Sequence, residues 1–534
     1  ARGSQPQFVR ESPRPLPDPP EFDVVVCGGT LGVFMAAALA VRGLRVAVVE
    51  RGPLRGREQE WNISRKELLE LEHVGVATRE ELEACIAIEF NPVRVGFAWQ
   101  PGHDTHATSG AAPSPTPAGP ASAGATAGSS SALAAAAAGT AGAVTPNPDT
   151  TSRQYSRIAT PTSTPGSGLS DATIRSSGAS GSLGAAAGGG GFRGTEVWTR
   201  DVLNLGVRPD ALVGLMRRKL ESYGGVVLER TALDGISVHP NGCGLSIRPQ
   251  SAGSPEASKG TASPGDDAAD SSASSTQPPL TARLVLDCMG HFSPIVRQIR
   301  WGQRPDGVCL VVGSMATGFP PNTTADVILT TTPLQPPEAP FNRAQYFWEA
   351  FPAAHHASSS SSPSSARTTY MFTYTTAEAY RGSLGALLED YWRLMPQYQG
   401  VRLEDIDIQR VLFGFFPAYK DTPLKPAFDR VLQVGDAGGL QSPLSFGGLA
   451  ALSRHVGRLT AAITEAVDTD ALDRSSLGLI ASYNPGLSSS WMMQKAMSVR
   501  QGQPPPPQLI NRMLVRTGRV EDCGQTGFGR CSCS

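Results

Sequence analysis

Residues 23–32, DVVVCGGTLG, decide the fold of this chain. An acidic residue and three valines form a continuous β-branched run, which is typical of a parallel strand buried on both faces. Small and apolar residues then continue from 33 to 41 as a helix that Gly43 ends. Residues 45–49 form a second buried strand. The sequence therefore predicts a strand–helix–strand unit and an α/β, Rossmann-like fold.

The glycine-rich turn after the first strand fits the pattern GxGxxG, except that Cys27 stands in the first position. Gly29 allows the backbone to approach a pyrophosphate, Gly32 allows close helix–strand packing, and the helix N-terminus supplies amide donors. Glu50, at the end of the second strand, is placed to accept a hydrogen bond from a ribose hydroxyl. A glycine-rich turn without a ligand is the alternative. The predicted cofactor residues are Gly28, Gly29, Thr30, Leu31, Gly32, Glu50 and Arg51.

Two further turns resemble parts of a nucleotide site. One covers residues 287–293 after the strand 283–286, and the other covers 434–439 and leads to Gly447-Gly448 before a helix. A carboxylate in the third turn can accept from a ribityl hydroxyl. A nicotinamide dehydrogenase needs only the first turn, so three turns predict an extended FAD; a scaffold that has lost its flavin is the alternative. The additional predicted cofactor residues are Gly290, Gly435, Asp436, Gly447 and Gly448.

Composition limits the class of protein. The chain has 534 residues, and its 58 Gly, 44 Pro and 17% charged residues are concentrated unevenly. Lys and Arg total 46 against 47 acidic residues, so no basic field exists to bind nucleic acid. The sequence contains no run of 18 apolar residues, so it predicts no membrane-spanning helix. The 8 cysteines are scattered along the chain, which indicates a reducing compartment. Their spacing does not predict a metal site.

Low-complexity stretches divide the chain, and about 400 residues remain for folded structure. We predict a discontinuous FAD-binding domain, a substrate lobe of α+β type, and disordered inserts. The predicted segments are a disordered tail (1–20), the FAD-binding domain in three parts (21–102, 192–307 and 425–470), the substrate lobe (308–424), inserts (103–191, 250–279 and 354–366), and a C-terminal segment (471–534) with an atypical end from 517.

Several longer motifs resemble one family. GREQEWNISR at 56–65 and YFWEAFP at 346–352, together with residues 24–32, 204–207 and 287–297, look like the CruA/CruP-type lycopene cyclases, nearest the plastid CruP branch. The family lies within the p-hydroxybenzoate hydroxylase and geranylgeranyl reductase-like FAD superfamily. Met289 stands where that superfamily usually has Asp, and residues 517–534 do not resemble the family.

The resemblance implies a redox-neutral cyclisation of a linear carotene such as lycopene. A carboxylic acid protonates a ψ-end, the cation closes to a ring, and a base removes a proton, with reduced FAD stabilising the cation electrostatically. NAD(P)H would be an indirect electron source. Glu349 is the first candidate acid because aromatic residues surround it; a solvent-facing glutamate is the alternative. Glu60 and His291 are further catalytic candidates, against a loop ion pair and a structural turn histidine. Arg65 is a candidate contact for the FAD phosphate or ring, and a solvated loop salt bridge is the alternative.

The same resemblance implies a plastid location, with a targeting peptide not present in this chain, and peripheral contact with a membrane. Two other functions stay open: a flavin reductase or monooxygenase acting on another isoprenoid, and a non-catalytic flavin- or carotenoid-binding factor. The ring type, the electron donor and the oligomeric state are left open by the sequence.

Overall fold

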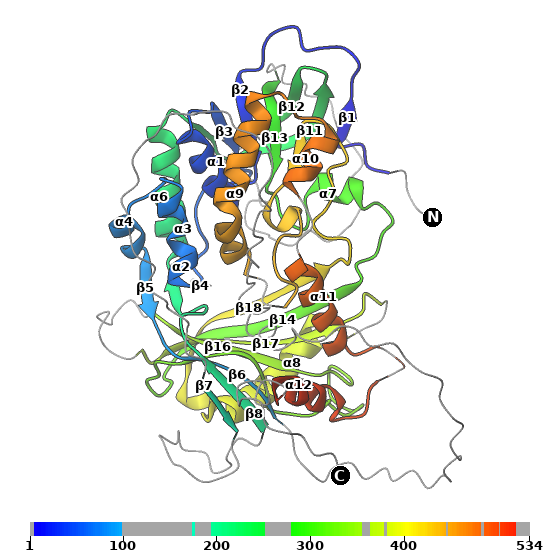
Figure 1. Ribbon diagram of the computed structural model, residues 1–534. Coiled ribbons are helices and arrows are strands. Elements are labelled where there is room, and N and C mark those ends of the chain that lie inside the picture. The colour runs from blue at the N-terminus through cyan, green and yellow to red at the C-terminus, as the bar shows by residue number, and fades with distance from the viewer. Residues whose placement is uncertain are drawn as a thin grey trace, which may run out of the picture.

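A computed structural model describes residues 5–98, 173–176, 194–250, 279–354, 364–378, 382–444, 447–481, 485–500, 502 and 504–519. Two lobes lie one above the other, each built on an eight-stranded sheet (Figure 1). Most residues of the three predicted inserts, and those from 520 onward, lie outside the described residues. Among the described residues, no helix is long and apolar enough to cross a membrane.

The first sheet forms the upper lobe of Figure 1. Its centre is the parallel set β3–β2–β13, in which β2 pairs with both neighbours, and β19 pairs in parallel with β13. The carboxyl ends of these strands therefore share one edge, where ligands bind in open α/β sheets. The predicted Rossmann-like α/β fold is confirmed. The strands are β1 (Val9–Glu11), β2 (Phe22–Cys27), β3 (Val46–Val49), β10 (Val226–Leu228), β11 (Thr231–His239), β12 (Gly242–Pro249), β13 (Leu280–Asp287) and β19 (Val431–Gln433).

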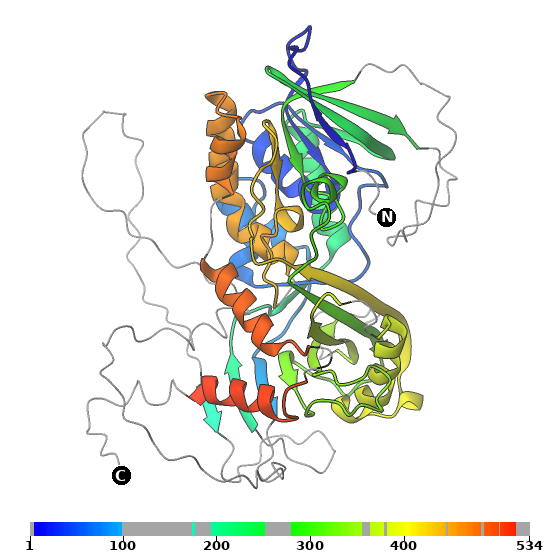
Figure 2. The same ribbon diagram turned by 90° about the vertical axis from the view of Figure 1, so that its right-hand side faces the viewer.

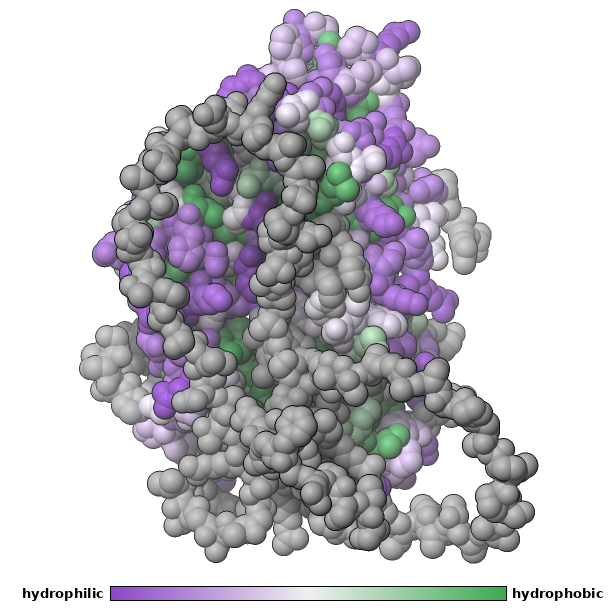
Figure 3. Space-filling view, viewed as in Figure 1, coloured by the Kyte–Doolittle hydropathy of each residue, from purple (hydrophilic) through white to green (hydrophobic). Residues whose placement is uncertain are grey.

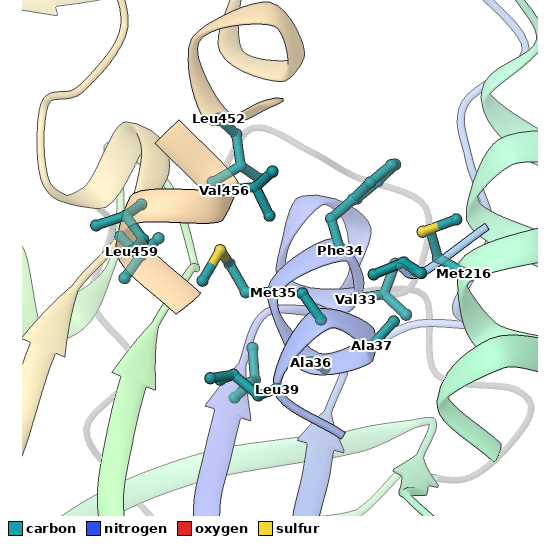
Figure 4. Packing of buried hydrophobic residues seen from close by; sticks show 14 of the residues in the cluster. Val33, Phe34, Met35, Ala36, Ala37, Leu39, Met216, Leu452, Val456 and Leu459 are labelled. Atoms are coloured by element: carbon teal, nitrogen blue, oxygen red, sulfur yellow. The ribbon is translucent and has the colours of Figure 1, made fainter. Parts of the chain in front are cut away.

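Helix α1 (Gly29–Ala40) lies in the core between α6 (Pro209–Ser222) and α9 (Gly448–Asp468). In Figure 4, Met35 points toward α9 and Val33 points toward Met216 of α6. The helix is apolar on all sides, as expected of one that is buried all round. This packing holds the N-terminus of α1 rigidly against the end of β2.

The second sheet forms the lower lobe and is mainly antiparallel, with the order β18-β14-β17-β16-β15-β6-β8-β7. Helix α8 (Leu384–Gln399) packs on one face, where Val312, Met371 and Trp348 meet Leu387 and Tyr391. The opposite face is turned toward the first lobe. The strands are β6 (Val93–Ala98), β7 (Thr173–Ser176), β8 (Gly194–Thr199), β14 (Gly307–Thr317), β15 (Ala325–Thr330), β16 (Phe347–Ala353), β17 (Ala366–Thr375) and β18 (Asp407–Ala418).

Shorter elements surround the two large sheets. Strands β4 (Trp61–Ile63), β9 (Leu205–Val207) and β5 (Ile86–Glu89) form a small sheet beside the junction of the lobes. In the view of Figure 3, hydrophilic residues dominate the described surface of the upper lobe. The remaining helices are α2 (Arg65–Leu68), α3 (Glu70–His73), α4 (Arg79–Glu83), α7 (Pro294–Ile299), α10 (Arg474–Ile480), α11 (Pro485–Met497) and α12 (Leu509–Arg519), with short 3₁₀ turns η2 (Leu403–Asp405) and η3 (Gly435–Ala437).

Three segment boundaries differ from the sequence-based prediction. The tail predicted over 1–20 contains β1, which pairs in parallel with β11 at the edge of the first sheet. Strands β6 and β8, predicted within the FAD-binding domain, pair with each other and join the second sheet through β15. Two residues predicted within the third insert also belong to the folded structure. Ser364 forms an isolated β-bridge with Asn322, and Ala366 is the first residue of β17. In each case the partner strand is distant in sequence, so local composition did not reveal the pairing.

Candidate functional site

The turn between β2 and α1 accepts only glycine at two positions. Gly28 has a φ of 93°, and a Cβ there would lie 2.7 Å from the carbonyl oxygen of Cys288. A Cβ on Gly32 would lie 2.7 Å from Val26 Cγ1. Gly28 permits a positive φ and close packing of the turn against Cys288, which follows β13. Gly32 permits close contact between α1 and β2. The close helix–strand packing predicted for Gly32 agrees with this geometry, whereas the constraint at Gly28 was not predicted.

Glu50 ends β3 beside the same turn, as predicted. Its carboxylate accepts hydrogen bonds from the N–H groups of Gly29, at 2.6 Å, and of Gly52, at 3.0 Å. The carboxylate thus lies at the start of α1, where the helix dipole favours a negative group. Thr30, the second residue of α1, is exposed, and Arg51 is exposed in the adjoining loop.

The third turn meets the first turn in space. Gly435, with a φ of 65°, begins η3, and Asp436 follows. A Cβ built on Gly448 at the start of α9 would lie 3.0 Å from Asp436 Oδ1 and 3.3 Å from Leu31 Cδ1. Gly447 is the preceding N-cap residue. The starts of α1 and α9 therefore converge on Asp436, whose buried Oδ1 has no hydrogen-bond donor among the described residues.

The middle turn is ordered by Asp287 at the end of β13. Its carboxylate accepts from the Ser293 hydroxyl at 2.6 Å and from the Met289 N–H at 3.1 Å. Burial raises the pKa of Asp287 to about 6, against these hydrogen bonds. Gly290 takes a φ of 77° and turns the chain toward His291. The position where the superfamily has Asp is Met289 here, and the carboxylate that orders this turn stands two residues earlier.

His291 joins the middle and third turns. Its Nε2 lies 4.0 Å from Asp436 Oδ2 and 3.2 Å from Gln441 Nε2. Burial lowers the pKa of His291, against the attraction of Asp436, so the neutral imidazole is favoured at neutral pH. A pocket opens beside it between α7, the end of β18 and η3, and Arg300 and Tyr419 form part of its lining. The pairing with Gln441 was not predicted, because no motif links the two residues.

Glu349 lies on the face of the second sheet that is turned toward the first lobe. It is directly opposite Tyr370 of β17, and Phe347 and Phe351 flank it along β16 on the same face. The side chain is half-buried, and burial raises the pKa of Glu349 to about 8. A pKa of about 8 means that the Glu349 carboxyl is protonated in most molecules at pH 7. The solvent-facing alternative does not describe this environment.

Three consecutive residues before β4 tie the first lobe to this sheet. Arg410 of β18 donates to Glu58 at 2.8 Å, Gln59 donates to Thr368 of β17 at 2.9 Å, and the N–H that follows β16, at Ala354, donates to Glu60 at 2.9 Å. Burial raises the pKa of Glu60 to about 7, although the Ala354 N–H and the charge of Arg410 oppose the shift. The carboxyl of Glu60 is thus a group that titrates near neutrality, next to the sheet that carries Glu349.

Arg57 is the cation that sequence reasoning missed. Burial raises the pKa of both Asp436 and Tyr370, and in each case the positive charge of Arg57 acts in the opposite direction. The guanidinium therefore lies within electrostatic reach of the third turn and of the second sheet, and it lies 5.9 Å from the centroid of the Trp61 ring. Its place in the motif GREQEW was the available signal.

The prediction for Arg65 is corrected by the structure. Its guanidinium forms ion pairs with Glu83 of α4 and, at 2.5 Å, with Glu89 of β5. These partners belong to the small peripheral sheet and its neighbouring helix, and none of them lies in the three turns. Arg65 therefore stabilises the contact between α2, α4 and β5 instead of reaching a cofactor.

Comparison with solved structures finds several proteins with a similar overall fold. A geranylgeranyl bacteriochlorophyll reductase-like protein from Thermoplasma acidophilum matches 96% of this chain and 92% of its own, with a TM-score of 0.51 and 12% identity. The p-nitrophenol 4-monooxygenase PnpA from Pseudomonas putida matches with 94% and 95% coverage, a TM-score of 0.49 and 11% identity. The halogenase PltM matches with 86% and 73% coverage, a TM-score of 0.48 and 12% identity.

The chain shares its fold with the geranylgeranyl bacteriochlorophyll reductase-like protein. At these identities the likeness concerns the fold, and it leaves substrate and reaction open. No protein-family model matches the sequence, and no curated protein matches it either.

Proposed function

We propose that this chain is an FAD-dependent enzyme of isoprenoid metabolism, resembling the lycopene cyclases, that closes the ψ-ends of a linear carotene to rings. The proposal includes a plastid location, which follows from the resemblance to CruP. One observation carries the reaction type: Glu349 lies beside Phe347, Phe351 and Tyr370 on the second sheet, where burial raises its pKa to about 8.

The described residues fit FAD. Asp436 Oδ1 is a buried acceptor without a donor, and a ribityl hydroxyl would supply one. Glu50 after β3 fits a ribose hydroxyl, and the amides of α1 that follow Gly29 fit a pyrophosphate, since the Gly29 N–H already donates to Glu50. Arg57 offers a cation between the third turn and the sheet. When bound there, reduced FAD would supply a negative ring close to a developing cation.

Glu349 supplies the proton in this proposal. A carboxylic acid protonates a polyene only if it remains protonated at working pH, and burial gives Glu349 that property. The rings of Phe347 and Tyr370 lie along the same face and can stabilise positive charge through their π-systems. The proton adds to the terminal double bond, and the electrons of a second double bond close the ring.

A base then removes one proton from the ring, so the substrate keeps its mass and no electron is transferred. Glu60 fits this second role because its pKa of about 7 leaves a large ionised fraction at neutral pH. His291, favoured in its neutral form beside Asp436, is a second candidate acceptor. Proton return to Glu349 would complete the cycle.

A flavin-dependent reductase acting on another isoprenoid is the second candidate. It is favoured by the likeness to the geranylgeranyl bacteriochlorophyll reductase-like protein, which covers nearly the whole chain. In a reductase the flavin would transfer hydride, and the substrate would gain two hydrogens.

The test is expression of the full chain in lycopene-accumulating bacteria, followed by assay of the purified holoprotein with lycopene in D2O. Cyclisation predicts ring-containing carotenes that carry one deuterium per ring, and Glu349→Gln should abolish them while flavin absorbance stays unchanged. Glu404→Gln is the matched control, because Glu404 is fully exposed at η2. A product that gains hydrogen or oxygen, or unchanged lycopene with normal flavin content, would refute the cyclase proposal.

A further inference from the structure

The outer edge of β18 is a long apolar strand edge. Within the described residues β18 pairs only with β14 and ends the second sheet. Helix α8 covers one face of the second sheet. On that same face, β18 has three apolar side chains that are exposed: Val411 (43%), Phe413 (63%) and Phe415 (43%). Phe292 is 58% exposed and packs edge-on against Phe415, with ring centroids 5.2 Å apart. No charged residue occurs from 411 to 418.

This edge is open to solvent in a way that proteins usually avoid. Native sheets protect edge strands with charges, Pro, bulges or a covering element, because a bare edge pairs with other chains. Strand β18 has a bulge between residues 408 and 410 and Pro417 near its end, and only the stretch between them, residues 411–416, is without charge, Pro or bulge. Figure 2 shows β18 sweeping along the outer border of the lower lobe, with α8 below it. Phe292, Phe413 and Phe415 together leave about 300 Å² exposed, which equals the smaller of the largest apolar patches on monomers, and such patches are often functional.

The orientation of the free backbone groups follows from Ala418 and Pro417. The carbonyl of Ala418 accepts a hydrogen bond from the Asp306 N–H on the β14 side, so even-numbered residues of the strand point their backbone groups inward. Odd-numbered residues therefore point theirs outward, and Pro417, which has no N–H, belongs to that set. Phe413 thus presents both an N–H and a carbonyl at the free edge.

We propose that this chain forms a two-fold symmetric homodimer in which β18 pairs antiparallel with β18 of a second copy, centred on Phe413. Phe413 then faces its own counterpart, and Val411 of each copy faces Phe415 of the other, on the same face. Aromatic–aromatic and aromatic–β-branched pairs are the favourable cross-strand combinations. The two eight-stranded sheets become one continuous sheet.

A second copy fits this edge better than a lipid bilayer does. A bilayer would cover the phenylalanines but leave the backbone N–H and carbonyl groups of the edge without partners, which is costly in hydrocarbon. A second β18 satisfies both kinds of group at once. The net charge of −1 gives no long-range repulsion between two copies.

The test is sedimentation equilibrium of the full chain at micromolar concentration. Wild type should be a dimer. Phe413→Lys places like charges opposite each other at the axis and should weaken dimerisation at least about 30-fold. Phe413→Glu should do the same, and an equimolar mixture of the two variants should form a heterodimer. The matched control is Leu479→Lys on α10, where an apolar side chain is 79% exposed, and this variant should remain dimeric.

Circular dichroism and flavin content of each variant show that it is folded. A monomeric wild type overturns the proposal, as does a Phe413→Lys variant that stays dimeric or a mixture that does not associate. Binding of monomeric wild type to phosphatidylglycerol vesicles, lost in Phe413→Lys, would assign the edge to a membrane instead. A monomer whose melting temperature falls in Phe413→Lys would show that another part of this chain covers the edge.

Discussion

The titration of Glu349 can be tested through stability, without substrate or cofactor. The pKa of this carboxyl is about 8 in the folded chain against an ordinary value of 4.5. Below pH 4.5 both the folded and the unfolded state carry the proton. Between pH 4.5 and 8 the unfolded state releases it and the folded state keeps it, so the free energy of unfolding falls as the pH rises. A shift of this size corresponds to about 3–5 kcal/mol over that range.

Glu349→Gln keeps the shape of the side chain but removes its proton equilibrium. The variant should therefore match wild type at pH 4.5 and become more stable than wild type by about 3–5 kcal/mol at pH 8.5. Urea unfolding of the flavin-free protein, followed by tryptophan fluorescence, measures the difference, since Trp348 is buried next to Glu349 in β16.

Glu60 titrates in the same range, with a pKa of about 7, but it is present in both proteins and cancels in the comparison. Glu404→Gln on the surface should leave the pH dependence as in wild type. If Glu349→Gln loses stability with pH as steeply as wild type does, Glu349 is ionised in the folded chain at neutral pH, and the reasoning that makes it the acid is refuted.

Two further predictions concern the turns. Gly28→Ala should lower the free energy of unfolding by about 2–4 kcal/mol in urea, because its Cβ would meet the Cys288 carbonyl at 2.7 Å with φ at 93°; an unchanged midpoint would contradict this geometry. Arg57→Met should weaken FAD binding about tenfold or more in a fluorescence titration, through loss of a cation beside the cofactor. Arg65→Met should leave that affinity within about twofold, because Arg65 binds Glu83; the opposite ranking would restore the sequence-based assignment.

The sequence predicted what short-range patterns determine. The β2–α1–β3 unit and the contact of Glu50 with Gly29 follow from a motif whose parts lie within about thirty residues, so spacing alone specifies the geometry. The turn at Asn241-Gly242 between the antiparallel strands β11 and β12 likewise follows a local pattern, because Asn-Gly favours tight hairpin turns. These elements needed no knowledge of the rest of the fold.

Long-range register determined the rest. Glu349 acquires its environment from Tyr370 on the next strand, and that pairing depends on how β16 and β17 align. Strand β6 joins the second sheet although it follows first-lobe sequence directly, because β15, more than 200 residues later, provides its edge. The position of Arg57 between the lobes likewise depends on their packing. Such facts are absent from any single window of sequence.

The three contacts of Glu58, Gln59 and Glu60 imply that one loop of the first lobe fixes the distance between the two lobes at the site. Each of these neighbouring side chains reaches a different strand segment of the second sheet, so a hinge movement of one lobe against the other must break all three contacts together. This loop, about ten residues beyond β3, thereby controls the separation of Asp436 in the first lobe from Glu349 in the second. Lengthening this loop by one residue should change which substrates fit, while the carboxyl groups of Asp436 and Glu349 remain in place.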